Sequence, residues 1–133
     1  MAKTNLPGRV PEHGYILLVE DDEQVANLVQ STLQDHRYRV VAATTCLDAF
    51  VNITKEQPSL LLLDISLPDG NGLSLLADLR DGLLTETVPV IVVSSMPVSR
   101  SEMRRLGIQK YVAKPFSVPG LVLVVESYLC NED

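Results

Sequence analysis

Residues 59–72 read SLLLLDISLPDGNG, and this stretch decides the fold. Its apolar run, residues 59–63, shows no alternation of polar and apolar side chains, which is typical of a strand buried on both faces. The run ends at Asp64, and a Pro-Asp-Gly turn signal follows at residues 68–70. A strand of this kind predicts a parallel sheet that is covered by helices and carries a carboxylate at its edge.

On either side of this strand, short apolar runs alternate with segments of helical periodicity. We predict four more strands, at residues 15–19, 39–43, 90–93 and 110–113. Asp22, Thr45 and Ser117 can cap helices. The expected inward residues are Val25, Leu28, Val29, Thr32 and Leu33 in the first helix, Cys46, Ala49, Phe50 and Ile53 in the second, and Leu73, Leu76, Ala77 and Leu79 in the third. The fourth helix is expected at Ser99–Leu106, and the last at Ser117–Tyr128.

Five strands that alternate with five helices predict one α/β domain. Short connections between them imply right-handed crossovers. We therefore expect a doubly wound (βα)5 fold, with a parallel five-stranded sheet in the flavodoxin-like order 2-1-3-4-5 and a shortened fourth helix. The domain should span residues 15–129, between a mobile N-terminal leader at 1–14 and a C-terminal tail at 130–133.

The composition excludes several classes of protein. The 133 residues include 17 acidic and 11 basic side chains, for a net charge of -6, which argues against direct binding of nucleic acid. The apolar runs are far too short for a transmembrane helix, so no membrane partner is expected. Two cysteines, Cys46 and Cys130, cannot build a disulfide framework, and a reducing cytoplasm is the expected location.

Residues of chemical use follow the predicted strands. Glu20 and Asp21 come after the first strand, Asp64 after the third, Ser94 after the fourth and Lys114 after the fifth. Ligands of parallel sheets bind at the carboxyl ends of the strands, so these side chains should meet at one edge. Three carboxylates packed together repel one another unless a cation is bound, and hard oxygen ligands suit Mg²⁺ or Mn²⁺.

This set of groups is suited to phosphoryl transfer. A carboxylate, a divalent cation, a lysine and a hydroxyl together stabilise the charge that spreads over a phosphoryl group. A carboxylate can also be the nucleophile, which gives an aspartyl phosphate. The residues alone therefore predict a phosphorylated carboxylate at this sheet edge.

Four motifs, in this order, resemble those of the response-regulator receiver domain of two-component signalling. They are YILLVEDDE at 15–23, LLLDISLPDGNG at 61–72, VIVVSS at 90–95 and YVAKPF at 111–116. The resemblance covers residues 15–129 and implies a cytoplasmic phosphoprotein of a phosphorelay. It implies no enzyme beyond the protein's own phosphorylation and slow autodephosphorylation, and no cofactor other than the metal.

The resemblance also implies roles for the residues around the metal. Asp64 matches the phosphoacceptor aspartate and a metal ligand. Asp21 matches the direct metal ligand of the acidic pair, and Glu20 matches the acid that acts through water. Ser66 matches the residue whose backbone carbonyl binds the metal.

Further positions match the residues that respond to phosphorylation. Ser94 corresponds to the switch hydroxyl that turns toward the phosphoryl group, and Tyr111 to the aromatic switch. Lys114 corresponds to the lysine that pairs with a phosphoryl oxygen, and the peptide bond between Lys114 and Pro115 is usually cis in the family. Met96, two residues after Ser94, is apolar beside the path of a hydrolytic water, which predicts slow self-dephosphorylation.

The implied phosphoryl donor is a sensor histidine kinase or a histidine phosphotransfer protein. A downstream protein should bind the face of the fourth helix, fifth strand and fifth helix. The stretch from Ser94 to Lys114 holds five of the 11 basic residues, which favours an acidic partner: Arg100, Arg104, Arg105, Lys110 and Lys114. The apolar run 121–125 cannot face the core on all sides, so we hypothesise that the last helix forms a homodimer or partner interface.

Two other functions fit part of the pattern. A phosphohydrolase of the haloacid dehalogenase type also attacks with a strand-end aspartate. Such enzymes have a second aspartate two residues later, where this chain has Ser66. An interaction module that keeps the fold without phosphorylation would not need the full set of site residues.

Overall fold

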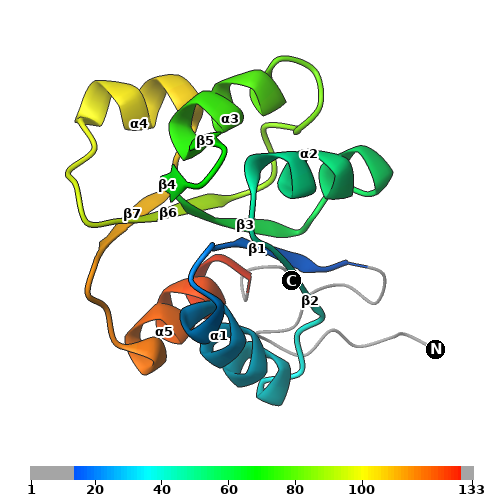
Figure 1. Cartoon of the computed structure of the whole chain (residues 1–133), viewed down its shortest axis with the longest axis vertical. Helices are drawn as coiled ribbons and strands as arrows, with labels where there is room; N and C mark the ends of the chain where they lie inside the picture. The colour runs from blue at the N-terminus through cyan, green and yellow to red at the C-terminus, as the bar shows by residue number, and fades with distance from the viewer. Residues whose placement is uncertain (1–13, 130–133) are drawn as a thin grey trace.

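The computed structural model describes residues 14–129, which form a parallel sheet between two layers of helices (Figure 1). The sheet has five strands in the order β2-β1-β3-β6-β7, which confirms the predicted order. The strands are β1 (Ile16–Val19), β2 (Val40–Ala43), β3 (Leu60–Asp64), β6 (Val90–Ser94) and β7 (Lys110–Ala113). The predicted leader, apart from Gly14, and the predicted tail lie outside the described residues.

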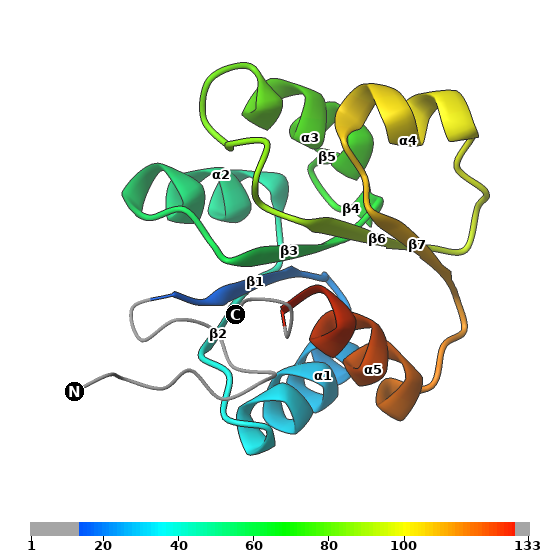
Figure 2. The same ribbon diagram turned by 180° about the vertical axis from the view of Figure 1, so that it is seen from behind.

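Five helices cover the two faces of the sheet. One layer contains α1 (Glu23–Asp35) and α5 (Val118–Leu129), and the other contains α2 (Cys46–Lys55), α3 (Gly72–Arg80) and α4 (Arg100–Leu106) (Figure 2). The fourth helix has 7 residues, so the expectation of a short helix is confirmed. The predicted caps also agree: the side chains of Asp22, Thr45 and Ser117 accept hydrogen bonds from the first turns of α1, α2 and α5.

A small antiparallel hairpin was predicted only as a turn. Its strands are β4 (Ser66–Leu67) and β5 (Gly70–Asn71), each too short for an alternating pattern to be read from the sequence. Asp69, at the tip, accepts hydrogen bonds from the backbone N–H groups of Cys46 at 2.7 Å and Leu47 at 3.1 Å. The hairpin that follows Asp64 is thereby joined to the start of α2.

The central strand β3 shows why its apolar run has no alternation of polar and apolar residues. Leu61 and Leu63 of β3 pack into the layer of α2, α3 and α4, whereas Leu60 and Leu62 pack against α1 and α5. All four side chains are at most 1% exposed. Both faces of the sheet are therefore core, and the position of the chain's polar groups is restricted to the strand ends and the outer helix faces.

Two of the inward residues predicted in the helices are wrong. Leu28 in α1 is 55% exposed and Phe50 in α2 is 38% exposed. The faces that pack on the sheet centre on two small buried residues, Ala49, which was predicted to face inward, and Ala26, which was not. Small side chains at these positions let the helices approach the sheet closely, so the larger neighbours lie at the margin or outside it.

The last helix exposes part of its apolar run, as expected. Leu121, Val122 and Val125 are buried against the sheet, but Leu123 is 67% exposed. Within residues 14–129, no helix combines the length and apolar character that crossing a membrane requires.

One arginine joins three segments on the side of the molecule away from the carboxyl ends of the strands. The Arg80 guanidinium donates hydrogen bonds to the backbone carbonyls of Leu106 and Gly107, both at 3.0 Å, and of Thr85 at 2.6 Å. Gly107 has a positive φ of 68°, which ends α4 in a left-handed cap. The ends of α3 and α4 and the loop before β6 therefore share one side chain.

Tyr15 provides a test of how β1 packs against α2. Its hydroxyl donates to the Glu56 carbonyl at 2.8 Å, and burial, with the nearby Glu56 charge, raises the pKa of Tyr15 to about 12 despite the opposing charge of Arg39. A group with a raised folded pKa stabilises the fold fully below its unfolded pKa and loses that contribution as pH rises through the folded value. The free energy of unfolding should therefore fall as pH rises from about 10 to about 12.

Urea denaturation at several pH values measures this dependence in the native chain and in Tyr15→Phe. The variant should lose stability less steeply over this pH range, because its ring cannot ionise. Parallel curves for the two proteins would contradict the assignment.

Candidate functional site

Glu20 lies directly after β1 and is almost completely buried, with 3% exposed. Its Oε2 accepts a hydrogen bond from the Asp22 backbone at 3.1 Å. Burial raises the pKa of the Glu20 carboxyl, and the nearby Asp64 charge acts in the same direction, while the Asp22 hydrogen bond and the Lys114 charge oppose the shift. This carboxylate is thus oriented by the backbone but poorly solvated.

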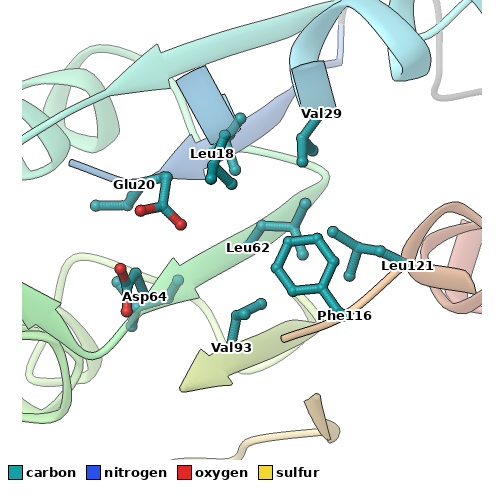
Figure 3. A pocket seen from close by; sticks show the side chains of 11 residues that line it. Leu18, Glu20, Val29, Leu62, Asp64, Val93, Phe116 and Leu121 are labelled. Atoms are coloured by element: carbon teal, nitrogen blue, oxygen red, sulfur yellow. The ribbon is translucent and has the colours of Figure 1, made fainter. Parts of the chain in front are cut away.

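Asp64 is the last residue of β3 and is also buried, with 4% exposed. Its Oδ1 accepts a hydrogen bond from the backbone N–H of Ser66 at 3.2 Å. Because β1 and β3 are adjacent and in parallel register, with Val19 opposite Leu63, Glu20 and Asp64 leave the sheet side by side. Figure 3 shows the two carboxylates at the ends of β1 and β3, where these residues line a small cavity of about 10 Å³ together with apolar side chains such as Phe116 and Leu121.

Lys114, directly after β7, holds its ammonium between the two carboxylates. Nζ lies 3.0 Å from Asp64 Oδ2 and 3.4 Å from Glu20 Oε1. Burial works to lower the pKa of Lys114, but the hydrogen bond and charge of Asp64, followed by those of Glu20, outweigh it, so that the pKa is raised. The lysine is therefore a fixed cation at this position, and the bond between Lys114 and Pro115 is cis, as the resemblance implied.

A third carboxylate completes the acidic cluster. Ligand oxygens of Glu20, Asp21 and Asp64 all lie within 4.8 Å of one another. Asp21 is exposed, so the cluster opens to solvent on this side. Three carboxylates at these separations, two of them buried, provide the hard oxygen ligands that a divalent cation such as Mg²⁺ prefers. The structure thus brings together the acidic residues that the sequence analysis selected.

The two predicted switch residues meet at the backbone of Met96. The buried Ser94 hydroxyl oxygen accepts a hydrogen bond from the Met96 N–H at 2.9 Å. The Tyr111 hydroxyl donates to the Met96 carbonyl at 3.1 Å and, at 3.5 Å, to the Ser94 carbonyl. Ser94 and Tyr111 come from the adjacent strands β6 and β7, and both bind the peptide backbone of Met96.

Gly72 is a further residue of the site that the sequence analysis noted only within a motif. A Cβ at this position would lie 2.5 Å from the Asp64 carbonyl oxygen and 2.9 Å from the Ile65 Cα. The Gly72 N–H donates to the Ile65 carbonyl at 2.6 Å. The start of α3 therefore fits directly against the backbone of the buried aspartate, and only a glycine leaves room for this approach.

Comparison with known proteins decides the family. Residues 16–126 match the response regulator receiver domain family. The chain belongs to this family. The polar-differentiation response regulator DivK of Brucella ovis is 30% identical to this receiver over 116 residues, which are 86% of this chain and 94% of the relative.

Two solved structures share the fold of this receiver. The receiver domain of Francisella response regulator 1452 has 24% sequence identity and a TM-score of 0.78, covering 88% of this chain and 97% of that chain. Response regulator TrrA of Thermotoga maritima, solved in complex with Mg(2+)-BeF, has 24% identity and a TM-score of 0.74, covering 87% of this chain and 99% of that chain.

Membership of the family settles the choice among the three functions. The chain is a phosphoacceptor receiver, a signalling module with an acidic pocket formed by Glu20, Asp21 and Asp64. The phosphohydrolase and the module without phosphorylation are therefore rejected. A receiver of a two-component system implies histidine kinase partners.

The close approach of Gly72 to Asp64 yields a prediction about stability. Gly72→Ala should destabilise the receiver by about 1–3 kcal/mol, because the added methyl group has only backbone atoms against it. Urea denaturation measures the loss. Ser74→Ala, at an exposed position of the same helix, is the control and should change stability little. If the two variants were equally stable, α3 would not be held against the Asp64 backbone.

Proposed function

We propose that Asp64 takes a phosphoryl group from a phosphohistidine of a sensor histidine kinase or a histidine phosphotransfer protein. The observation that carries the proposal is the position of Asp64. Its carboxylate is buried, has its Oδ1 bound to the Ser66 backbone, and lies 3.0 Å from the Lys114 ammonium. An oriented carboxylate next to a fixed cation is suited to attack a phosphorus that carries negative charge.

In the proposed reaction, a lone pair of an Asp64 oxygen attacks phosphorus while the bond from phosphorus to the donor imidazole breaks. The bonding electrons leave with the imidazole nitrogen. Lys114 then exchanges its contact with Asp64 for one with a phosphoryl oxygen, so its charge follows the charge of the transferred group. The reaction needs no proton transfer from Asp64, which must be ionised at the start.

We assign the metal of this site as Mg²⁺, with Mn²⁺ as a substitute. Asp21 and Asp64 are the proposed direct ligands, and Glu20 acts through a water. The Ser66 backbone carbonyl is the remaining ligand that the protein provides. The Mg(2+)-BeF complex of the Thermotoga maritima relative supports this assignment. When bound, the cation neutralises the charge of the carboxylates and of the incoming phosphoryl oxygens.

The signal is proposed to leave the site through Ser94 and Tyr111. If the Ser94 hydroxyl turns toward a phosphoryl oxygen, it gives up the hydrogen bond that it accepts from Met96. Tyr111 holds the carbonyl of the same residue, so its contact changes when this segment moves. The position of the tyrosine on β7, next to α4, carries the change to the outer surface.

That surface is the proposed binding face for a downstream protein. It includes Arg100, Arg104 and Arg105 of α4, with Lys110 at the start of β7 and the exposed Leu123 of α5. The basic side chains favour an acidic partner, and Leu123 supplies an apolar contact. Alternatively, a second copy of the chain binds Leu123 and forms a homodimer through α5. We propose that the receiver works in the cytoplasm, where histidine kinases have access to ATP.

The central prediction concerns phosphorylation by a small donor. Incubation with acetyl phosphate and Mg²⁺ should produce one phosphoryl adduct, detected by intact mass measurement. The adduct should be absent in Asp64→Asn and after chelation of the metal, and strongly reduced in Lys114→Met. Asp78→Asn is a matched control, because it removes an exposed carboxylate of α3 and should leave the adduct unchanged. An adduct that persisted in Asp64→Asn, or none with acetyl phosphate or a phosphohistidine donor, would exclude the proposal.

The lifetime of the adduct is a separate prediction. Met96 is 64% exposed and has no polar side-chain atom that could orient a water toward Asp64. The purified phosphorylated receiver should therefore retain its phosphoryl group for minutes or longer, and Met96→Glu should shorten this time, because a carboxylate can accept a hydrogen bond from the attacking water. Phosphate release measured over time tests both statements. A native lifetime of seconds would contradict the first.

A further inference from the structure

The outer face of α2 carries a continuous apolar stripe that the phosphorylation site does not use. Leu47 is 66% exposed, Phe50 is 38% exposed and Val51 is 39% exposed. With the exposed Thr54, they occupy positions i, i+3, i+4 and i+7 of the helix, which lie on one side of it. Large apolar side chains grouped in this way on a surface indicate a binding face.

The position of α2 leaves this stripe accessible. The helix packs against α3 and against strands β1 and β2, and it lies at the end of its layer, beside the edge strand β2 (Figure 1). No helix within residues 14–129 lies on its other side (Figure 2). In this layer α3 lies between α2 and α4, and α5 lies on the other face of the sheet, so the stripe forms a second surface rather than an extension of the first (Figure 2).

Two opposite charges flank the stripe on the same side. Asp48 and Lys55 are seven residues apart, which places them on one flank of the helix with a separation of about 10.5 Å along its axis. Within residues 14–129, neither takes part in a salt bridge. The flank is therefore acidic toward the start of α2 and basic toward its end.

This arrangement is complementary to itself. When two identical helices pack antiparallel about a two-fold axis, like flanks meet and each residue i that contacts residue j is matched by j contacting i. An axis close to Val51 brings Asp48 of each copy opposite Lys55 of the other, and Leu47 opposite Thr54, with the central apolar residues facing each other. In a parallel arrangement about a two-fold axis the like flanks lie on opposite sides of the contact, so Asp48 would not meet Lys55.

We propose that the stripe of Leu47, Phe50 and Val51 is a contact between two copies of this chain, with their α2 helices antiparallel and Asp48 paired with Lys55 across the interface. A single helix from each copy buries less surface than stable dimers do, so the dimer should be weak, with a dissociation constant in the micromolar range or above. The inference does not depend on phosphorylation of Asp64, and a failure of that function would leave its test intact.

The first experiment is sedimentation equilibrium of the full chain over a wide concentration range. The native chain should dimerise reversibly, and Phe50→Asp should weaken the dimer by roughly 100-fold or more, because a charge would be buried at the centre of the contact. Leu28→Asp is the matched control, since it places the same charge at an exposed apolar position of α1 and should leave the dimer constant unchanged. Leu123→Asp tests the alternative contact through α5. Circular dichroism checks that these variants fold.

The second experiment exchanges the two flanking charges. Asp48→Lys and Lys55→Asp should each weaken self-association by roughly tenfold, because like charges then face each other across the axis. The double variant with both changes should restore it. A mixture of the two single variants should form a heterodimer more tightly than either associates with itself, which no interface elsewhere on the molecule would produce.

Three results would overturn the proposal. One is a strict monomer at millimolar concentration, which is also the result expected if the N-terminal residues or another protein cover α2. Another is a dimer lost in Leu123→Asp and kept in Phe50→Asp, which would transfer the contact to α5. The third is a double charge variant that associates no better than the single ones, which would exclude the antiparallel pairing.

Discussion

The site depends on one ammonium group held between two buried carboxylates. Adjacent parallel strands end at the same level, so β1 and β3 deliver Glu20 and Asp64 side by side above apolar side chains. Burial, together with the nearby Asp64 charge, raises the pKa of the Glu20 carboxyl. Lys114, contributed by the strand two places away from β3, supplies the opposing charge at 3.0 Å and 3.4 Å. The complete sheet, out to its edge strand β7, is therefore needed for the pocket to hold its charges.

The location of the site could be predicted from the sequence because it follows from strand ends alone. The runs before Glu20 and Asp64 are apolar on both faces, so these strands had to lie inside the sheet with their carboxyl ends together. That argument needs no knowledge of side-chain contacts. It extends to Ser94 and Lys114, which end the neighbouring strands, and the structure places all four at one edge.

Packing details could not be predicted in the same way. Hydrophobic periodicity ranked Leu28 and Phe50 as inward, because it weighs how apolar a side chain is and not how closely the helix approaches the sheet. The structure buries Ala26, which was not predicted, and Ala49, which was, while Leu28 and Phe50 remain exposed. The contact of Asp69 with α2 joins residues that are far apart in sequence. The fit of Gly72 against the Asp64 backbone depends on how the chain turns back after β3. Only the composition of the turn, Pro-Asp-Gly, pointed to this region.

Arg80 determines where the short fourth helix can pivot. Its guanidinium holds the carbonyls of Leu106 and Gly107, so the end of α4 is attached to the end of α3. Within residues 14–129, no arginine attaches the beginning of α4 in this way, and residues 95–99, which contain Pro97, connect it to Ser94. If Ser94 moves on phosphorylation as proposed, we expect the displacement to tilt α4 about its contacts with Arg80. The largest movement would occur at Arg100, the basic side chain farthest from those contacts.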